Sequence, residues 1–361
     1  MERMTIFCYC VILLAALWVA LSRLPAGAEG HMPLPYLIAL IPFLWIPLTV
    51  IVVWAIATHD WGLACVSGAV AITASSQRID YWGKAWNTKP NTAAAQTKRE
   101  TARNASHTNN VSEPQQTTDV PAVPAGENIF LPSSFRVMTL NCRYGRADAA
   151  DIVKHIRQRN IDVLALQEVT DELIGRLDAA QLADILPYRQ FGDAKDSDNG
   201  GFNAIFSRVK PTAMSPSAVE IPAADVPFIT MVLEDGRAVM VASAHPKSPM
   251  RGCRDWSKGI LLLGKLAHGS FIGNRDIAVV MGDLNSSIEH PSFRALLKAG
   301  FRDASFTQAK GPNLTFPSWL KWPRIELDHV LFTPGLKPSG VEAFEVKDTD
   351  HLALTATLTL A

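Results

Sequence analysis

The distribution of apolar residues marks the first 80 residues as different from the rest of the chain. Residues 5–22 and 36–57 are long apolar runs without a charge, and 61–76 is a shorter and weaker one. A helix needs about 20 apolar residues to cross the hydrocarbon core of a bilayer. We therefore predict two or three transmembrane helices. For the first run a cleaved signal peptide is the alternative, since Arg3 precedes it and small residues follow it.

A polar segment follows, and it has no apolar periodicity. Residues 81–134 are dominated by Thr, Asn, Gln, Ala, Ser and Pro. Such a segment cannot bury enough surface to offset the entropy lost on ordering. We predict a flexible linker here.

From residue 135 to 361, short apolar runs alternate with amphipathic helical patterns. Apolar residues spaced three and four apart indicate helices, and short apolar runs bounded by turn residues indicate strands. The predicted strands cover 135–141, 161–168, 202–208, 228–234, 237–245, 277–285, 325–332 and 352–360. The predicted helices cover 147–159, 171–186, 255–268 and 291–299. Hairpins mixed with crossover helices predict a sheet-rich α/β sandwich.

Charge and cysteine content narrow the function classes. The chain has 34 basic and 34 acidic residues; eight of each sign precede Phe135, which leaves 26 of each in the C-terminal domain. Nucleic-acid affinity depends strongly on basic side chains that neutralise phosphates, so this balance disfavours a dedicated nucleic-acid binder. Five cysteines exclude a disulfide scaffold. Cys142 and Cys253, the two in the domain, could equally pair or stay free.

Polar side chains gather where the predicted strands end, a position from which they can reach a cleft. These residues are Asn141, Gln167, Glu168, His245, Asp283, Asn285 and Asp328, with Asp350 and His351 just before the last strand. Asp283 and Asn285 are two residues apart, so in an extended segment they face the same side. An Asx-turn is the alternative for this pair, and a turn cap is the alternative for Asn141.

The order of these motifs resembles the endonuclease/exonuclease/phosphatase superfamily. That superfamily includes deoxyribonuclease I, abasic-site endonucleases, inositol polyphosphate 5-phosphatases and neutral sphingomyelinases. The motifs are TLNCR, LALQEV, SAHP, VVMGDLN, LDHVL and TDH, in that order across residues 135–361. The resemblance implies a four-layer α/β/β/α sandwich and a metal-dependent hydrolase of phosphoester bonds.

The resemblance also implies roles for individual residues. Glu168 would bind Mg²⁺, or Mn²⁺ in its place, with Asn141 as a carbonyl ligand or orienting neighbour and Asp350 as a further ligand. Asp283 would orient or deprotonate the attacking water, and Asn285 would donate to the phosphate. His351 and His245 would contact the phosphate, with Asp328 orienting His351. Asn203 fits the active-site asparagine of the family, or a polar residue at a strand entry. By strand alternation, His329 should face away from Asp328.

Three functions compete at this point. The first is a membrane-anchored phosphodiesterase or phosphatase acting on lipid headgroups, sugar phosphates or other small phosphates. The second is a metal-dependent nuclease, and the third an inactive binding module. The third is disfavoured because every polar position that the mechanism needs is occupied by a suitable residue type. GRADAADIV (145–153), RLDAAQLADILPYR (176–189) and TFP (315–317) resemble a membrane-anchored bacterial subgroup whose catalytic domain is extracytoplasmic. Basic residues after the third apolar run would, by the positive-inside rule alone, place the domain in the cytoplasm. We follow the resemblance and expect the domain outside the cytoplasm.

Overall fold

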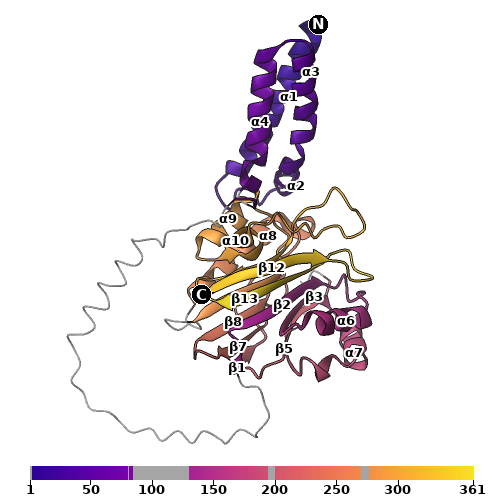
Figure 1. Ribbon diagram of the computed structural model, residues 1–361, viewed down its shortest axis with the longest axis vertical. Helices are drawn as coiled ribbons and strands as arrows, with labels where there is room; N and C mark the ends of the chain where they lie inside the picture. The colour runs from indigo at the N-terminus through magenta and orange to yellow at the C-terminus, as the bar shows by residue number, and fades with distance from the viewer. Residues whose placement is uncertain (1, 80, 84–129, 194–199, 270–275) are drawn as a thin grey trace, which may run out of the picture.

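The N-terminal part of the computed structural model is a bundle of helices that stands on a larger α/β domain (Figure 1). The structure describes residues 2–79, 81–83, 130–193, 200–269 and 276–361. The bundle contains α1 (Glu2–Ala20), α2 (Leu34–Leu40), α3 (Trp45–Ala57) and α4 (Trp61–Ile79), with short 3₁₀ turns at Leu21–Arg23 and Ile41–Phe43. Helices α1 and α3 both pack against α4. Inside the bundle, the Ser67 hydroxyl donates to the Leu48 carbonyl over 2.9 Å.

Length and composition single out fewer candidate spans than the sequence pattern predicts. The helix Arg3–Arg23 is long and apolar enough to cross a membrane, and only 22% of its most apolar window is buried. Leu34–Phe43 and Trp45–Ala57 pass the same test together, as a pair bent by 45°. Helix α4 is long enough but is not a candidate, because polar residues such as Gln77 and Arg78 dilute its apolar run. The expected third span at 61–76 is therefore not supported by composition.

Two sheets form the centre of the α/β domain. In one sheet the strand order is β12-β13-β2-β3-β5-β4, and in the other it is β1-β7-β8-β9-β11-β10 with β6 paired to β7. The strands of the first sheet are β2 (Ser134–Asn141), β3 (Val163–Val169), β4 (Tyr188–Phe191), β5 (Phe202–Ser207), β12 (Leu336–Phe344) and β13 (Ala353–Leu360). Those of the second are β1 (Phe130–Leu131), β6 (Ala213–Ser215), β7 (Phe228–Leu233), β8 (Ala238–Ser243), β9 (Ile277–Asp283), β10 (Arg302–Asp303) and β11 (Asp328–Phe332).

The sheets pack face to face, and helices cover both outer faces. The core between the sheets includes Phe135, Val137, Val241, Val279 and Leu354, all buried. Helices α6 (Ala149–Arg159) and α7 (Asp171–Ala179) cover the sheet that holds β2 and β3. Helices α8 (Pro249–Leu263), α9 (Pro291–Lys298) and α10 (Ala304–Gln308) lie on the other side of the molecule, and α8 and α9 cover the sheet of β8 and β9. This is the four-layer α/β/β/α sandwich that the sequence motifs imply.

Local sequence explains where two helices depart from prediction. The helix expected over 171–186 begins as predicted, where the Thr170 hydroxyl accepts from the Leu173 N–H. It ends at Ala179 because Gln181 takes a left-handed conformation, with φ of 63°, and a 3₁₀ turn follows at Leu182–Asp184. The helix expected over 255–268 is preceded by a short helical piece from Pro249, and Gly252, with φ of 154°, breaks the two apart, so that the regular helix begins close to the predicted start. Its last part is a 3₁₀ turn, Gly264–Ala267.

The bundle is docked directly on the α/β domain, which corrects the limits of the expected linker. Tyr81 is 1% exposed; it stacks on Phe306 with ring centroids 3.8 Å apart and hydrogen-bonds to Glu326. At the other end, Phe130–Leu131 forms β1 beside β7. Tyr81 and Phe130–Leu131 both lie inside the predicted linker of 81–134. Because Tyr81 is buried and Phe130–Leu131 pairs in a sheet, these residues belong to the folded part of the protein. Residues 84–129 lie outside the described part.

Candidate active site

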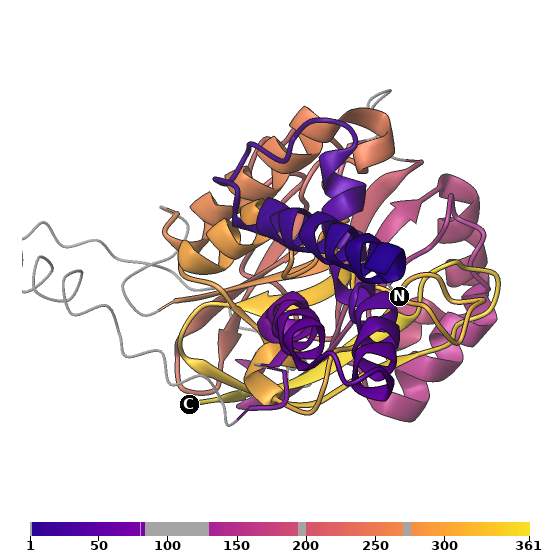
Figure 2. The ribbon, with the colours of Figure 1, turned by 90° about the horizontal axis from the view of Figure 1, so that it is seen from above.

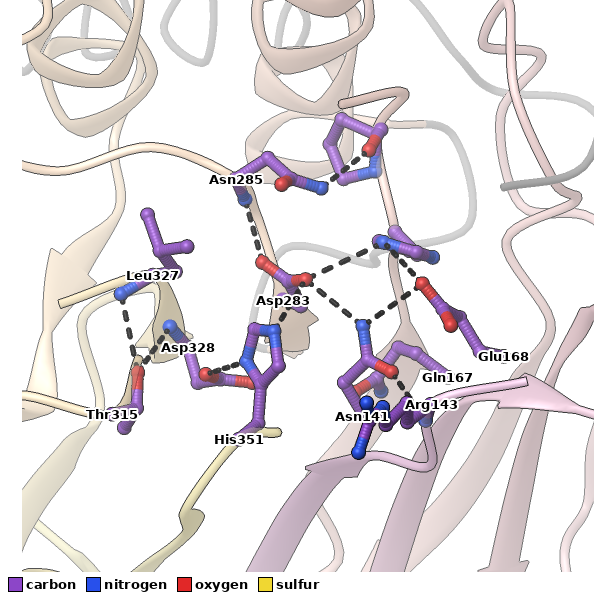
Figure 3. A network of polar contacts seen from close by, with 12 residues as sticks. Asn141, Arg143, Gln167, Glu168, Asp283, Asn285, Thr315, Leu327, Asp328 and His351 are labelled. Atoms are coloured by element: carbon purple, nitrogen blue, oxygen red, sulfur yellow. Dashed lines mark hydrogen bonds and ion pairs between the residues drawn. The ribbon is translucent and has the colours of Figure 1, made fainter. Parts of the chain in front are cut away.

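The predicted site residues come from the ends of strands in both sheets, and the fold brings the ends together. Strands β2 and β3 are parallel and pair Asn141 with Gln167. Strands β9 and β11 are antiparallel and pair Asp283 with Asp328. Because the two sheets face each other, Asn141 and Asp283 meet across the gap, with the Asn141 Nδ2 donating to Asp283 Oδ2 over 3.0 Å (Figure 3).

Glu168 is held in an unusual backbone position at the mouth of the site. Its φ is 53°, and a register shift between Leu166 and Val169 interrupts the pairing of β3 with β5. Such strained positions persist only where the surroundings fix them, and they concentrate at functional sites. The Tyr144 N–H donates to Glu168 Oε2 over 2.8 Å. A Cβ on Gly200 would lie 2.3 Å from the Tyr144 ring and 3.2 Å from that oxygen, so this close approach requires glycine.

Asp283 is the centre of the hydrogen-bond network. Its Oδ1 accepts from the Asn285 N–H over 2.8 Å, and its Oδ2 lies 3.4 Å from His245 Nε2 and 3.6 Å from His351 Nε2. Burial alone would raise the pKa of Asp283. The two histidines and the Asn285 N–H outweigh burial and hold the pKa below its ordinary value. Asp283 is therefore ionised at neutral pH.

His351 forms a tight buried pair with Asp328. Its Nδ1 lies 2.7 Å from Asp328 Oδ2, and the Thr315 hydroxyl accepts from the Asp328 N–H. Burial lowers the pKa of His351, but Asp328 and Asp283 outweigh burial and raise it to about 10. The ring is thus a cation at neutral pH, fixed by Asp328 and with Nε2 directed at Asp283. This is the orientation that the family resemblance implies.

His245 lies between the two acidic sides of the site. Its Nε2 is 3.9 Å from Glu168 Oε1 as well as 3.4 Å from Asp283. Burial lowers the pKa of His245, but the contacts with Asp283 and Glu168 outweigh burial, so that the net shift is upward. Among the described residues, its Nδ1 has no hydrogen-bond partner.

Three of the predicted residues lie at the margin of this network. The Asn285 amide donates to the Pro246 carbonyl over 3.1 Å, which directs it toward the segment of His245. Asp350 is 3.8 Å from the Arg143 guanidinium and is partly exposed. Asn203 is buried, and its Nδ2 donates to the Asp225 carbonyl over 2.7 Å. Among the described residues the Asn203 Oδ1 has no hydrogen-bond partner, so no hydrogen bond of this amide joins the network of carboxylates.

Thr349 and Ser243 support the site and were missed by sequence reasoning, whereas Gln167 was named as a strand-end residue without a role. The Thr349 hydroxyl donates to the Asn141 carbonyl over 2.6 Å and accepts from the His351 N–H. The Gln167 amide donates to the Ser243 hydroxyl over 3.0 Å and so joins the two sheets below the site. Their signal in the sequence was only proximity to Asn141, Glu168 and His351. Cys142 and Cys253 are both free, which decides between the two alternatives for these thiols.

A second buried cluster contains Asp303, Glu326 and His329. His329 faces away from Asp328, as strand alternation predicts: its Nδ1 is 2.8 Å from Asp303 and its Nε2 2.8 Å from the Ser286 carbonyl. A carbonyl only accepts, so Nε2 carries a proton, and Nδ1 faces a carboxylate. Burial lowers the pKa of His329, but Asp303 raises it to about 9. His329 is thus protonated and forms an ion pair with Asp303. The ligand atoms of Asp303, Glu326 and His329 are nevertheless close enough together to hold a metal ion.

The donors around Glu168 fit a hard divalent cation. Asp328 is paired with the cationic His351 at 2.7 Å, whereas the ion-pair contact that the described residues give Glu168 is the longer one to the His245 ring, at 3.9 Å. A carboxylate oxygen of this kind is what Mg²⁺ prefers. Asn141 turns its carbonyl oxygen to the Arg143 N–H and its NH₂ to Glu168 and Asp283. In this conformation Asn141 orients the acids, and it would bind a cation only after its amide turned over.

Comparisons with solved structures agree with this fold. A humanized TDP2 from D. rerio with 14 mutations is 16% identical and covers 63% of this chain and 99% of its own, with a TM-score of 0.52. D. rerio TDP2 complexed with a single-strand DNA product is 17% identical, with coverage of 63% and 99% and a TM-score of 0.51. Sphingomyelinase C from Streptomyces griseocarneus is 17% identical, with coverage of 62% and 99% and a TM-score of 0.48. At these identities, the similarity concerns the fold.

A search of the curated proteins found no match. The profile of the endonuclease/exonuclease/phosphatase family matches residues 138–351, which is more than half of the chain and includes the carboxylates and histidines described above. The chain belongs to the endonuclease/exonuclease/phosphatase family.

Proposed function

We propose that this protein is a membrane-anchored, Mg²⁺-dependent phosphoesterase that hydrolyses its substrate by attack of water. The observation that carries the proposal is the arrangement of His351. This buried cation is fixed by Asp328 at 2.7 Å and aims Nε2 at the ionised Asp283. A phosphoryl group beside these two side chains would meet a proton donor, His351, and a proton acceptor, Asp283.

The roles of the residues follow from their charges. The ionised Asp283 accepts a hydrogen bond from the attacking water and orients it. His351, as a cation, donates to a phosphoryl oxygen, and His245 and the Asn285 amide are further donors at the same place. Glu168 would hold Mg²⁺ or Mn²⁺, with Asn141 and Asp350 in support; when bound, the ion would neutralise charge on the phosphoryl oxygens.

Charge balance supports a substrate other than nucleic acid. The domain from Phe135 carries equal numbers of basic and acidic residues, 26 of each. Binding to a nucleic-acid backbone depends on basic side chains that replace its counterions. A lipid headgroup, a sugar phosphate or another small phosphate does not need basic side chains along an extended surface. A nuclease is therefore the second candidate, and an inactive binding module is disfavoured by the complete set of charged partners.

The surface of the bundle supports membrane anchoring. Large apolar side chains point outward from all three long helices. They include Ile6, Phe7, Leu13, Leu14, Leu17, Val50, Val53, Val66 and Ile72. Lipid is the solvent that suits such a surface. Helix α4 packs beside α1 and α3 through small residues such as Ala64, Ser67 and Ala71, a common mode of packing in membranes. We propose that the bundle spans the membrane as a unit, with the catalytic domain outside the cytoplasm.

A substrate panel tests the function. The full-length protein in detergent is given plasmid DNA, sphingomyelin, phosphatidylinositol phosphates, sugar phosphates and bis(p-nitrophenyl) phosphate, with Mg²⁺ or with a chelator. We expect metal-dependent turnover of bis(p-nitrophenyl) phosphate and of a substrate other than DNA. Preferred cleavage of DNA would favour the nuclease, and no turnover of any phosphoester would contradict the proposal.

A further inference from the structure

The chain segment from Phe316 to Arg324, called here the rim loop (residues 316–324), connects the site to the foot of the bundle. At its start, the Phe316 ring lies 4.9 Å from the His351 ring. The Ser318 N–H donates to the Asp350 carbonyl over 2.8 Å, and its hydroxyl donates to the Thr349 carbonyl over 2.7 Å. The loop is thus fixed to the segment that carries the catalytic histidine.

The far side of the rim loop is apolar and exposed. Trp319 is 64% exposed, Leu320 38% and Trp322 58%, and Lys321 between them is also exposed. Trp322 contacts Phe43 of the bundle, with ring centroids 6.0 Å apart. In Figure 1 the gold loop rises beside the foot of the bundle. Tryptophan is enriched at the boundary between the hydrocarbon and headgroup layers, where lysine meets anionic headgroups.

The opposite rim of the site also touches the foot of the bundle. Helix α8 starts four residues after His245. The Arg254 side chain on α8 lies 3.2 Å from His31, which follows α1, and Gly30 packs against the backbone of Cys253 and Arg254. Seen along the bundle, the helices stand over the catalytic domain (Figure 2). Both flanks of the site are therefore fixed at the level where the bundle meets the domain.

Buried polar contacts make this placement rigid. The Arg78 guanidinium pairs with Glu289 at 2.7 Å, and His290 Nε2 lies 3.0 Å from the Pro35 carbonyl. Glu29, which is fully buried, accepts from the Ser292 N–H at the start of α9 over 2.5 Å. A domain held in this way keeps its site at one height above the membrane that holds the bundle.

From these observations we propose that the rim loop inserts into the headgroup layer of the bilayer that anchors the bundle, and that the substrate is a phosphoester of a lipid in that same leaflet. The inference rests on the proposed function and specifies its substrate class. A lipid headgroup reaches the site by lateral diffusion, between a loop that contacts the membrane and helices that cross it. A soluble phosphate would gain no binding energy from the exposed side chains of Trp319, Leu320 and Trp322.

The test compares one headgroup in two forms. The full-length protein is reconstituted in vesicles of phosphatidylcholine and phosphatidylglycerol with sphingomyelin, phosphatidic acid or a phosphatidylinositol phosphate. The same headgroup esters are supplied without acyl chains in the second arm, and bis(p-nitrophenyl) phosphate in the third. We expect hydrolysis of at least one membrane lipid at a rate well above that of its soluble form. A wild-type protein that prefers the soluble form, or that cleaves no lipid, would overturn the inference while its turnover of bis(p-nitrophenyl) phosphate kept the proposed function intact.

A double variant isolates the loop. Leu320→Glu with Trp322→Glu removes two apolar side chains and places acidic groups against anionic phosphatidylglycerol headgroups, so we expect lipid hydrolysis to fall about tenfold or more with turnover of bis(p-nitrophenyl) phosphate unchanged. Met214→Glu on β6, an exposed methionine on the short strand paired with β7, which lies at the end of the domain away from the bundle (Figure 1), is the matched control and should change neither rate. Trp322→Phe should keep lipid hydrolysis and lose part of the fluorescence quenching by brominated lipids. Equal lipid rates in the double variant and the wild type, or unchanged quenching in Trp322→Phe, would contradict insertion.

Discussion

At the scale of single residues, the pair between His351 and Asp328 decides which atoms face the substrate. Asp328 occupies Nδ1, so that Nε2 is the nitrogen left to donate toward Asp283. The Asp328 carboxylate accepts from the Nδ1 side of the His351 ring, on the side away from the proposed phosphoryl position. We therefore regard His351 as a catalytic residue and Asp328 as a positioning residue.

This distinction predicts the effect of Asp328→Asn. The amide keeps the size of the side chain but removes the largest charge that raises the pKa of His351, so that this pKa falls and the ring is held less firmly. We expect kcat to fall about 10²-fold to 10⁴-fold, as for other general acids and bases, with KM changed less. The measurement is turnover of bis(p-nitrophenyl) phosphate across pH, and an unchanged pH profile in the variant would refute the role.

The pair between His329 and Asp303 makes a different prediction, because it concerns stability. The folded-state pKa of His329, about 9, is above the ordinary value of 6.5. The stabilisation is therefore complete below pH 6.5 and is lost as the pH rises through 9. Each pKa unit corresponds to about 1.4 kcal/mol, so the loss is roughly 3 kcal/mol across this window.

Thermal unfolding of the full-length protein between pH 6 and 9.5 checks this. The wild type should lose more stability over the window than His329→Gln, which cannot titrate at this position. Titratable groups outside the cluster of Asp303, Glu326 and His329 are the same in both proteins and cancel in the comparison. Glu326, whose raised pKa of about 7 is held down by the charge of His329, shifts with the substitution and is part of the measured difference. Parallel curves for the two proteins would mean that His329 is not the cation we infer.

At the scale of elements, the sequence predicted the strands that carry the site residues better than the short strands and tertiary contacts around them. Asn141, Glu168 and Asp283 were placed correctly at or beside the carboxyl ends of β2, β3 and β9, because a buried strand reads as a short apolar run and its polar end is visible beside it. Asp328 was expected at such an end too, but it is the first residue of β11. The short strands β4, β6 and β10 and the long strand β12 were missed. Strand β12 alternates buried and exposed residues and contains Pro338 and Gly340, which weaken the apolar pattern. Contacts such as that between Thr349 and Asn141 depend on tertiary structure and leave no local signal.

The foot of α4 is the element that we expect to hold the bundle on the domain. Tyr81 is fully enclosed against Phe306 and Glu326. Tyr81→Ala should remove about 3–5 kcal/mol of stability, by analogy with other buried aromatic side chains. Tyr81→Phe, which loses only the hydrogen bond to a carboxyl group, should cost about 1.5–3 kcal/mol. Thermal unfolding of both variants provides the measurement, and equal effects would show that packing against Phe306 contributes little.

At the scale of the whole molecule, the path of the chain fixes the relation between the N-terminus and the catalytic domain. Helix α1 runs from the free end of the bundle to its foot, α3 returns, and α4 runs back to the foot (Figure 1). If the bundle crosses the membrane as proposed, three passes place the N-terminus and the domain on opposite sides. A cytoplasmic N-terminus then puts the domain outside, although the basic residues after α4 favour the reverse by charge alone.

Alkaline phosphatase fusions test this path. The reporter folds only outside the cytoplasm, so we expect an active fusion after Ser76, at the end of α4, and an inactive one after His59, between α3 and α4. The two fusions serve as controls for each other. The reverse pattern would place the catalytic domain in the cytoplasm, and activity in both would mean that α4 does not cross the membrane.

The account depends most directly on a metal-dependent reaction at the network of Glu168, Asp283 and His351. The decisive measurement is the rate of bis(p-nitrophenyl) phosphate hydrolysis by the purified full-length protein, with Mg²⁺ or Mn²⁺ and with a chelator, beside the variants Glu168→Gln and His351→Ala. We predict turnover that requires the metal, that the chelator abolishes, and that each variant reduces at least about 10²-fold. Turnover that persists in the chelator, or in both variants while they remain folded, would contradict the account.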